Sequence, residues 1–205
     1  MSSFTFSISQ YADIAAWNEC IDSLNILKKY DIYSTIKANT LAENGKLKTL
    51  IWMKKNNLSL PDAVGAKLAA FNNHFNVLEF MESNNLPLPG IDTIHTCCSF
   101  GNLKMLKWIV SKKWVFPDVV AANFAAYHGQ LDILNWLKEN KFPLTDLNGA
   151  NAAAHNGHIN VLHWIKNNNL LLPDKSEMPW IEYCAHENVA GYKEVIEFIN
   201  NNCKN

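Results

Sequence analysis

Small and apolar residues recur along the chain with the spacing of helix faces. Ala122, Ala125 and Ala126 follow the i, i+3, i+4 spacing of one face, and Leu131 and Leu134 begin a second stripe a few residues later. The pattern predicts a short helix lined with small side chains, a turn, and a second helix with bulkier side chains. Each such segment is therefore expected to be a helical hairpin.

One register of this pattern runs through the middle of the chain with a period of 28 residues. A bulky second-helix position, expected to lie in the core, is held by Trp52, Phe80, Trp108, Trp136 and Trp164. The turn position is held by Gly45, Asn73, Gly101, Gly129 and Gly157. Glycine, and after it asparagine, best tolerates the positive φ of a tight turn. Five hairpins without an insertion predict an all-α solenoid with little or no β-structure.

Aspartate and asparagine recur between the hairpins. The aspartates are Asp62, Asp118, Asp146 and Asp174, and Gly90 takes the same place once. An aspartate here is expected to cap the following helix by accepting from its first free N–H groups. Asn-rich runs close the second helices, where asparagine can serve as a left-handed stop: Asn56-Asn57, Asn84-Asn85 and Asn167-Asn168-Asn169.

The register predicts one solenoid domain over residues 1–205, without an internal linker. Five regular repeats occupy residues 36–174, and residues 1–35 carry a degenerate N-terminal capping repeat. Residues 175–205 fit a C-terminal capping repeat only with a longer loop, with Trp180 among the packing positions of its first helix. Terminal repeats of solenoids are expected to deviate in this way.

Two segments carry a family resemblance. The run from Ala153 to Leu162 resembles the helix–turn–helix centre of an ankyrin repeat, and Asp92 to His95 resembles its opening. The Trp-rich, Asn-rich form with a Pro-Asp loop is similar to ankyrin-repeat proteins of amoeba-infecting giant DNA viruses and of amoebae. The resemblance implies protein–protein binding without catalysis. The 28-residue repeat is shorter than the usual length of about 33, so we expect no β-hairpin finger and a partner surface on the first helices.

Composition narrows the function classes. All 18 basic residues are lysine, and 19 acidic residues nearly balance them. Because arginine best pairs with phosphate and guanine edges, its absence disfavours nucleic acid as a partner. No signal-like or membrane-spanning run is seen, and five cysteines without a CxxC pair indicate reduced thiols. We expect a soluble, cytoplasmic protein that binds no membrane.

The candidate partner-binding residues are chosen from the first-helix positions not used for packing. They are Lys67, Phe71, Asn72, His95, Ser99, Phe100, Asn123, Tyr127, His128, Asn151 and His155. Rings surrounded by neutral hydrogen-bonding groups are typical of a protein-interface core. The alternative is that each ring packs against the neighbouring repeat.

Catalytic and metal-binding chemistry is not expected. His155, His158 and His163 fall at different places of one hairpin, and the adjacent Cys97 and Cys98 stand where other repeats have alanine. A free cysteine packs as a small apolar residue, and no zinc spacing occurs. No phosphate loop, nucleophile elbow or zinc-protease motif is present. We expect no cofactor, no metal, no small-molecule substrate and no enzymatic activity.

The sequence thus predicts a non-catalytic adaptor that binds a protein partner on its concave first-helix face. The alternative is a structural subunit built permanently into a larger, possibly viral, assembly. In that case apolar surface is expected to remain on a terminal repeat, for instance around Phe4, Phe6 and Ile8. If the protein is viral, we expect it to act in the host cytoplasm.

Overall fold

The computed structural model describes residues 8–33, 36–186 and 191–203. Over these residues every regular element is a helix and none is a strand. The predicted all-α architecture of helical hairpins is therefore confirmed for these residues. The chain divides into two compact units, Met1–Gly90 and Ile91–Asn205. That the whole chain forms a single domain stays a prediction.

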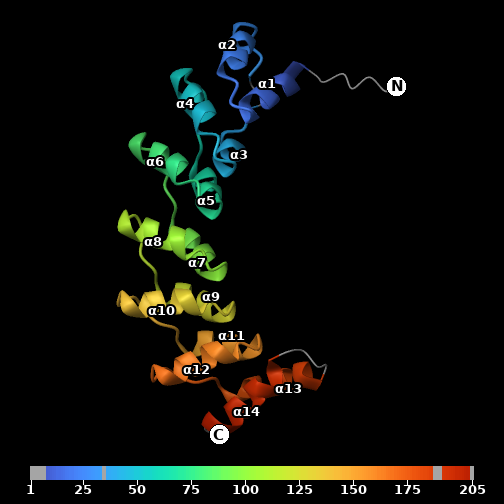
Figure 1. Ribbon diagram of the computed structural model, residues 1–205, viewed down its shortest axis with the longest axis vertical. Helices are drawn as coiled ribbons and strands as arrows, with labels where there is room; N and C mark the ends of the chain where they lie inside the picture. Colours follow the sequence, from blue (N-terminus) through green and yellow to red (C-terminus); the bar gives the residue numbers. More distant parts are fainter. Residues whose placement is uncertain (1–7, 34–35, 187–190, 204–205) are drawn as a thin grey trace, which may run out of the picture. The chain divides into compact units, whose positions relative to one another are not determined.

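The first unit holds three hairpins in its described residues. Its helices are α1 (Ile8–Trp17), α2 (Ile21–Lys29), α3 (Ala38–Glu43), α4 (Leu47–Lys55), α5 (Ala63–Phe71) and α6 (Phe75–Ser83). Each odd-numbered helix pairs with the next even-numbered one (Figure 1). The first helices α3 and α5 pack on each other, and the second helices α2, α4 and α6 follow one another.

The second unit holds four hairpins in its described residues. Its helices are α7 (Ile91–Ser99), α8 (Leu103–Ser111), α9 (Val119–Tyr127), α10 (Leu131–Glu139), α11 (Leu147–His155), α12 (Ile159–Asn167), the 3-10 helix η1 (Lys175–Glu177), α13 (Met178–His186) and α14 (Tyr192–Asn202). The first helices pack in the order α7, α9, α11, α13. Among the second helices, α12 contacts both α10 and α14.

The turn inside each hairpin is left-handed, as predicted. φ is +69° at Gly45, +72° at Gly129 and +60° at Asn73. Glu19, in the same place of the degenerate first hairpin, has φ +54°. A Cβ on Gly129 would lie 2.9 Å from Nδ1 of His158, so glycine there serves both the backbone conformation and a close approach by the next repeat.

A second left-handed residue follows each second helix of the regular repeats. The prediction is confirmed at Asn57, Asn85 and Asn169, with φ of +54° to +55°. Lys113 and Lys141 adopt the same conformation, with φ of +59° and +60°, although lysine has no preference for it. Their place in the hairpin therefore outweighs the residue type.

The core follows the two predicted stripes. Ala122, Ala125 and Ala126 on α9 are fully buried, and their small side chains let α9 pack closely between α7 and α11. On α10 the bulkier Ile133 and Leu134 are also fully buried. The small side chains of the first helices thus let neighbouring repeats pack closely, and the second helices supply most of the apolar volume of the core.

The recurrent bulky position is buried or half-buried, and two of its tryptophans bond to the preceding repeat. Trp52 and Trp136 are buried, and the half-buried members are Phe80, Trp108 and Trp164. Nε1 of Trp52 donates to Oδ1 of Asn25 at 2.8 Å, and Nε1 of Trp164 donates to Oδ1 of Asn135 at 2.7 Å. Each of these two indoles satisfies its one donor on the previous second helix, as a buried or half-buried tryptophan requires.

The last hairpin corrects one expectation. Trp180 was expected at a packing position of α13, yet 49% of it is exposed, whereas Ile181 and Cys184 are buried. The packing stripe thus starts one residue later, because Ile181 and Cys184 have the i, i+3 spacing that faces the neighbouring helices. The Trp180 ring instead meets the rings of His155 and Tyr183.

Candidate functional site

Within each unit, consecutive regular repeats are joined by a polar contact that we call the clasp: the side chain of a first-helix residue binds the aspartate that precedes the next first helix. Asn39 Nδ2 donates to Asp62 Oδ1 at 2.9 Å, and Asp62 N donates to Asn39 Oδ1 at 3.0 Å. The same carboxylate accepts from the N–H of Val64 at 2.8 Å and of Gly65 at 3.3 Å. The predicted aspartate cap is confirmed, and the capping carboxylate has Asn39 as a further partner.

The clasp recurs in the second unit at the same sequence separation. Asn123 Nδ2 donates to Asp146 Oδ1 at 2.9 Å, and Asp146 N donates to Asn123 Oδ1 at 3.2 Å. Asp174 N donates to Asn151 Oδ1 at 2.8 Å. Each of these pairs is 23 residues apart. This constant offset is the sequence signal that could have revealed the contact.

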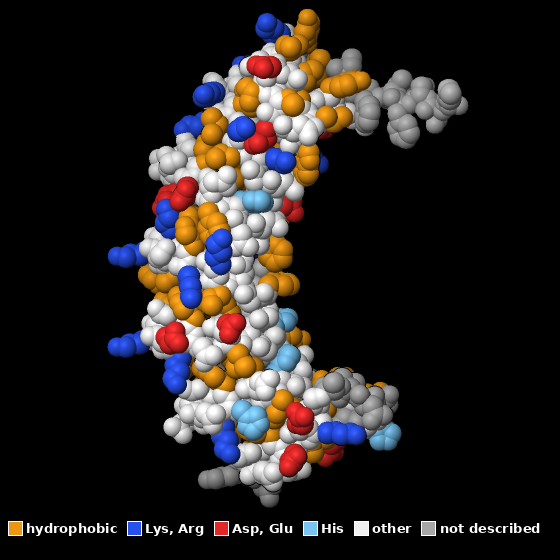
Figure 2. Space-filling view, in the orientation of Figure 1, with side chains coloured by type: hydrophobic (Ala, Val, Ile, Leu, Met, Phe, Trp, Pro, Cys, Tyr) orange, Lys and Arg blue, Asp and Glu red, His pale blue; other side chains and the backbone are white. Residues whose placement is uncertain are grey.

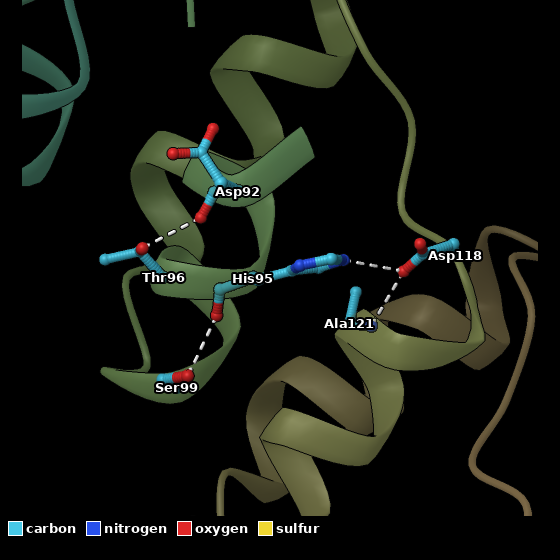
Figure 3. Close-up of polar contacts among 6 residues, drawn as sticks. All are labelled: Asp92, His95, Thr96, Ser99, Asp118 and Ala121. Atoms are coloured by element: carbon cyan, nitrogen blue, oxygen red, sulfur yellow. Dashed lines mark hydrogen bonds and ion pairs between the residues drawn. The ribbon is translucent and has the colours of Figure 1, made fainter. Parts of the chain in front are cut away.

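His95 takes the place of asparagine in one clasp (Figure 3). Its Nε2 lies 3.0 Å from Oδ1 of Asp118, and the same oxygen accepts from Ala121 N at 2.8 Å. Because a carboxylate can only accept, Nε2 carries the proton. Burial opposes ionisation of Asp118, but the hydrogen bonds from Ala121 and His95 and the charge of His95 outweigh it, so the Asp118 pKa is lowered.

Three of the predicted partner-binding residues therefore bind the next repeat. His95, Asn123 and Asn151 are half-buried in clasps. Ser99 Oγ donates back to the carbonyl oxygen of His95 at 2.9 Å. That these four residues also contact a partner stays a prediction.

The other predicted residues of the second unit are aromatic or imidazole groups at the ends of the first helices. Together with two residues of α13 they form what we call the ring row: Phe100, Tyr127, His128, His155, Trp180 and Tyr183. Figure 2 shows hydrophobic and histidine side chains following one another along one edge of this unit. The exposed fractions are 66% for Phe100, 45% for Tyr127 and 59% for Tyr183.

Ring contacts join members of the row. The His128 ring stacks on Phe100 with centroids 6.3 Å apart and meets Tyr127 edge-on at 4.7 Å. The His155 ring meets Trp180 edge-on at 5.2 Å, and Trp180 lies 5.8 Å from Tyr183. The sequence did not mark Trp180 and Tyr183 as exposed candidates for partner binding, because the last repeat is out of register with the others.

The backbone beneath the ring row is fixed by the following repeats. Gln130 Nε2 donates to the carbonyl oxygen of Ser99 at 3.2 Å, and His158 Nε2 lies 2.9 Å from that of Tyr127. The hydroxyl of Tyr192 donates to the carbonyl oxygen of His155 at 2.7 Å. Burial is the main cause that lowers the His158 pKa, which favours the neutral ring with its proton on Nε2. These bonds satisfy helix-end carbonyls and fix the backbone that carries the rings.

Three predicted residues lie in the first unit. Phe71 and Asn72 are exposed at the end of α5, and Lys67 is half-buried on the same helix. Asn72 Nδ2 donates to the carbonyl oxygen of Leu68 at 3.1 Å and so helps to end the helix. This unit therefore presents one exposed predicted ring.

The residues considered for other chemistry are kept apart or buried. His158 bonds a carbonyl and His155 meets Trp180, while His163 lies edge-on to Phe198 at 5.1 Å. In the described parts of the chain, no three His, Cys, Asp or Glu side chains are grouped as metal ligands. No helix in those parts is long and apolar enough to span a membrane.

Cys97 and Cys98 are packing residues. Both are buried on α7, and burial raises the pKa of each thiol to about 12. The thiolate, which is the reactive and metal-binding form, is thereby disfavoured. The expectation that they pack like the alanines of other repeats is confirmed.

The comparison with known families agrees with this geometry. A family described as ankyrin repeats in many copies matches residues 94–137 and 122–165. Each match begins in the first helix of one hairpin and ends in the second helix of the next. No curated protein matches the chain in sequence. The family match, with the same hairpin register continuing on both sides of it, supports an ankyrin-repeat protein.

Proposed function

We propose that the chain is a non-catalytic scaffold that binds a protein partner through the ring row. Ankyrin repeats generally mediate protein–protein interaction and are typically non-enzymatic. The observation that carries the proposal is the set of exposed rings at the ends of packed helices, with their backbone held by the neighbouring repeats. Exposed aromatic anchors on a rigid support are typical of binding hot spots.

Affinity capture from lysate tests this function. The full chain is compared with a variant carrying Phe100→Ala, Tyr127→Ala and Trp180→Ala. Phe116→Ala is the matched control, because Phe116 is an exposed ring of the same unit that stacks on Phe142. We expect partners captured by the parent chain and the control to be lost from the triple variant, with unchanged circular dichroism. Equal capture by all three proteins would contradict the proposal.

A structural subunit of a larger assembly is the second candidate, because α1 and α2 expose apolar side chains. Tyr11, Ile14 and Ile26 are 42% to 57% exposed and line an open cavity of about 350 Å³. The predicted patch at Phe4, Phe6 and the Ile8 side chain lies outside the described residues. Light scattering separates the candidates, since a monodisperse monomer favours the scaffold and concentration-dependent assembly favours the subunit.

We extend the proposal to the organism from which the protein comes and to the compartment in which it acts. The sequence resemblance points to amoebae or their giant viruses, and the host cytoplasm is then the compartment in which a partner is met. Fluorescence imaging of the tagged protein in amoebae tests this. Signal confined to a membrane-bounded compartment would contradict it.

A further inference from the structure

We infer, independently of the proposed function, that the protein unfolds in two steps, as two cooperative units divided between Gly90 and Ile91. The clasp recurs inside each compact unit, whereas the sequence at the junction lacks the clasp residues. The stability of a solenoid is roughly the sum of its repeats and of the contacts between neighbouring repeats. One weakly coupled junction can therefore divide the cooperativity of the whole array.

The clasp positions follow the 28-residue register, and four of their five pairs carry a clasp. These pairs are Asn39 with Asp62, His95 with Asp118, Asn123 with Asp146, and Asn151 with Asp174. The pair at the junction is Lys67 and Gly90. Glycine has no carboxylate, and the lysine ammonium has donors but no acceptor. This pair therefore cannot reproduce either half of the clasp.

The turn position also changes at the junction. Inside the second unit, Gly129 leaves room for His158 of the next hairpin, because a Cβ on the glycine would lie 2.9 Å from Nδ1 of the ring. The residues in the same places at the junction are Asn73 and Asn102. Asn73 carries the Cβ that glycine lacks, and Asn102 Oδ1 accepts from the N–H of Met105 in its own hairpin at 3.2 Å. Two positions that serve contact between repeats elsewhere thus hold different residues here.

A clasp couples the cap of one helix to the folding of the preceding repeat. One carboxylate oxygen of Asp62 accepts from Asn39 of the preceding repeat and from the N–H groups of Val64 and Gly65 in its own helix. The N–H of Asp62 also donates to Asn39, so unfolding of the preceding repeat removes two hydrogen bonds from the capped one. Gly90 offers no side chain for such a bond, so unfolding on one side of the junction removes no clasp from the other side.

Native-state hydrogen exchange of the full chain in increasing urea, resolved by mass spectrometry of peptides, tests the inference. We expect helices α3 to α6 to share one urea midpoint and helices α7 to α12 to share another. The double variant Lys67→Asn, Gly90→Asp copies the pair Asn39 and Asp62. We expect it to shrink the gap between the two midpoints by about half or more, and each single substitution to leave most of the gap, since the clasp needs both partners.

The reverse change is the matched control. Asn123→Lys with Asp146→Gly gives a clasp inside the second unit the residues of the junction. We expect this variant to separate the midpoint of α7 to α10 from that of α11 and α12, and to leave the midpoint of the first unit unchanged.

One midpoint shared by α3 to α12 in the parent chain would overturn the inference. So would an undiminished gap in the double variant Lys67→Asn, Gly90→Asp when its circular dichroism matches that of the parent. If that variant does not fold, the parent chain and the reverse change decide, and a second unit that stays undivided after Asn123→Lys with Asp146→Gly would contradict the coupling role of the clasp.

Discussion

Replacing Gly149 with alanine tests whether the clasp outweighs helix propensity. Alanine is the better helix former by about 0.5–1 kcal/mol, so Gly149→Ala on α11 would stabilise an isolated helix. In the structure, however, an added Cβ would overlap Thr145 Oγ1 and lie 2.5 Å from Asn123 Oδ1. Thr145 Oγ1 donates to that same amide oxygen at 2.8 Å, so the substitution strikes the clasp itself.

The cost of disturbing the clasp can be compared with the gain in helix propensity. Overpacking costs about 1–3 kcal/mol, and each displaced hydrogen bond costs about 0.5–1.5 kcal/mol. With the propensity gain subtracted, we expect Gly149→Ala to lower the free energy of unfolding by about 2 kcal/mol. Urea unfolding followed by circular dichroism measures this as a lower midpoint. Ala152→Gly on the same helix calibrates the local propensity, and we expect it to cost up to about 1 kcal/mol.

The chain itself offers a rescue. In the preceding clasp, His95 pairs with Asp118 and the position equivalent to Gly149 is Ala121, whose N–H still reaches the aspartate. The residues of that arrangement at the equivalents of 123, 145 and 149 are His95, Pro117 and Ala121. Copying them with Asn123→His, Thr145→Pro and Gly149→Ala should recover part of the lost stability. A more stable Gly149→Ala single variant would refute the reasoning, since propensity would then dominate over the clasp.

Two further results are expected from the electrostatics of the second unit. Because the Asp118 pKa is lowered in the folded state, its contribution to stability is complete above the ordinary carboxyl pKa of 3.8 and is lost as the pH falls through the lower folded value. Asp118→Asn should therefore unfold with a weaker dependence on pH below about 4 than the parent chain, and an unchanged dependence would contradict the pairing. Cys97 and Cys98 should resist a thiol reagent at neutral pH until the protein unfolds, whereas the exposed Cys20 should react at once. Mass spectrometry of labelled peptides checks this order, and rapid labelling of the α7 cysteines in the folded protein would contradict their burial.

Local chemistry accounts for what sequence reasoning predicted well. Glycine at position 129 and asparagine at position 73 mark the left-handed turns, and aspartate at position 62 caps its helix. Each signal acts over a few residues, so it needs no knowledge of the fold. The alanine stripe of α9 likewise reports its own burial through helical periodicity.

Contacts between repeats decided the features that sequence reasoning did not predict. Asn123 has the sequence features of a surface amide, yet it lies in a clasp because an aspartate 23 residues away reaches it. Trp180 has the sequence features of a core residue, yet it is half exposed because the last repeat starts its packing stripe one residue later. The exposure of Phe100 and Tyr127 also depends on what the neighbouring helices cover.

The sequence by itself determined the hairpins, their caps and their turns, because backbone preference and helical periodicity are short-range. Only the tertiary structure decided which first-helix side chains join repeats and which remain at the surface. The physical reason is that burial and hydrogen bonding at those positions depend on residues of the next repeat, and no local pattern specifies how the side chains of two repeats meet.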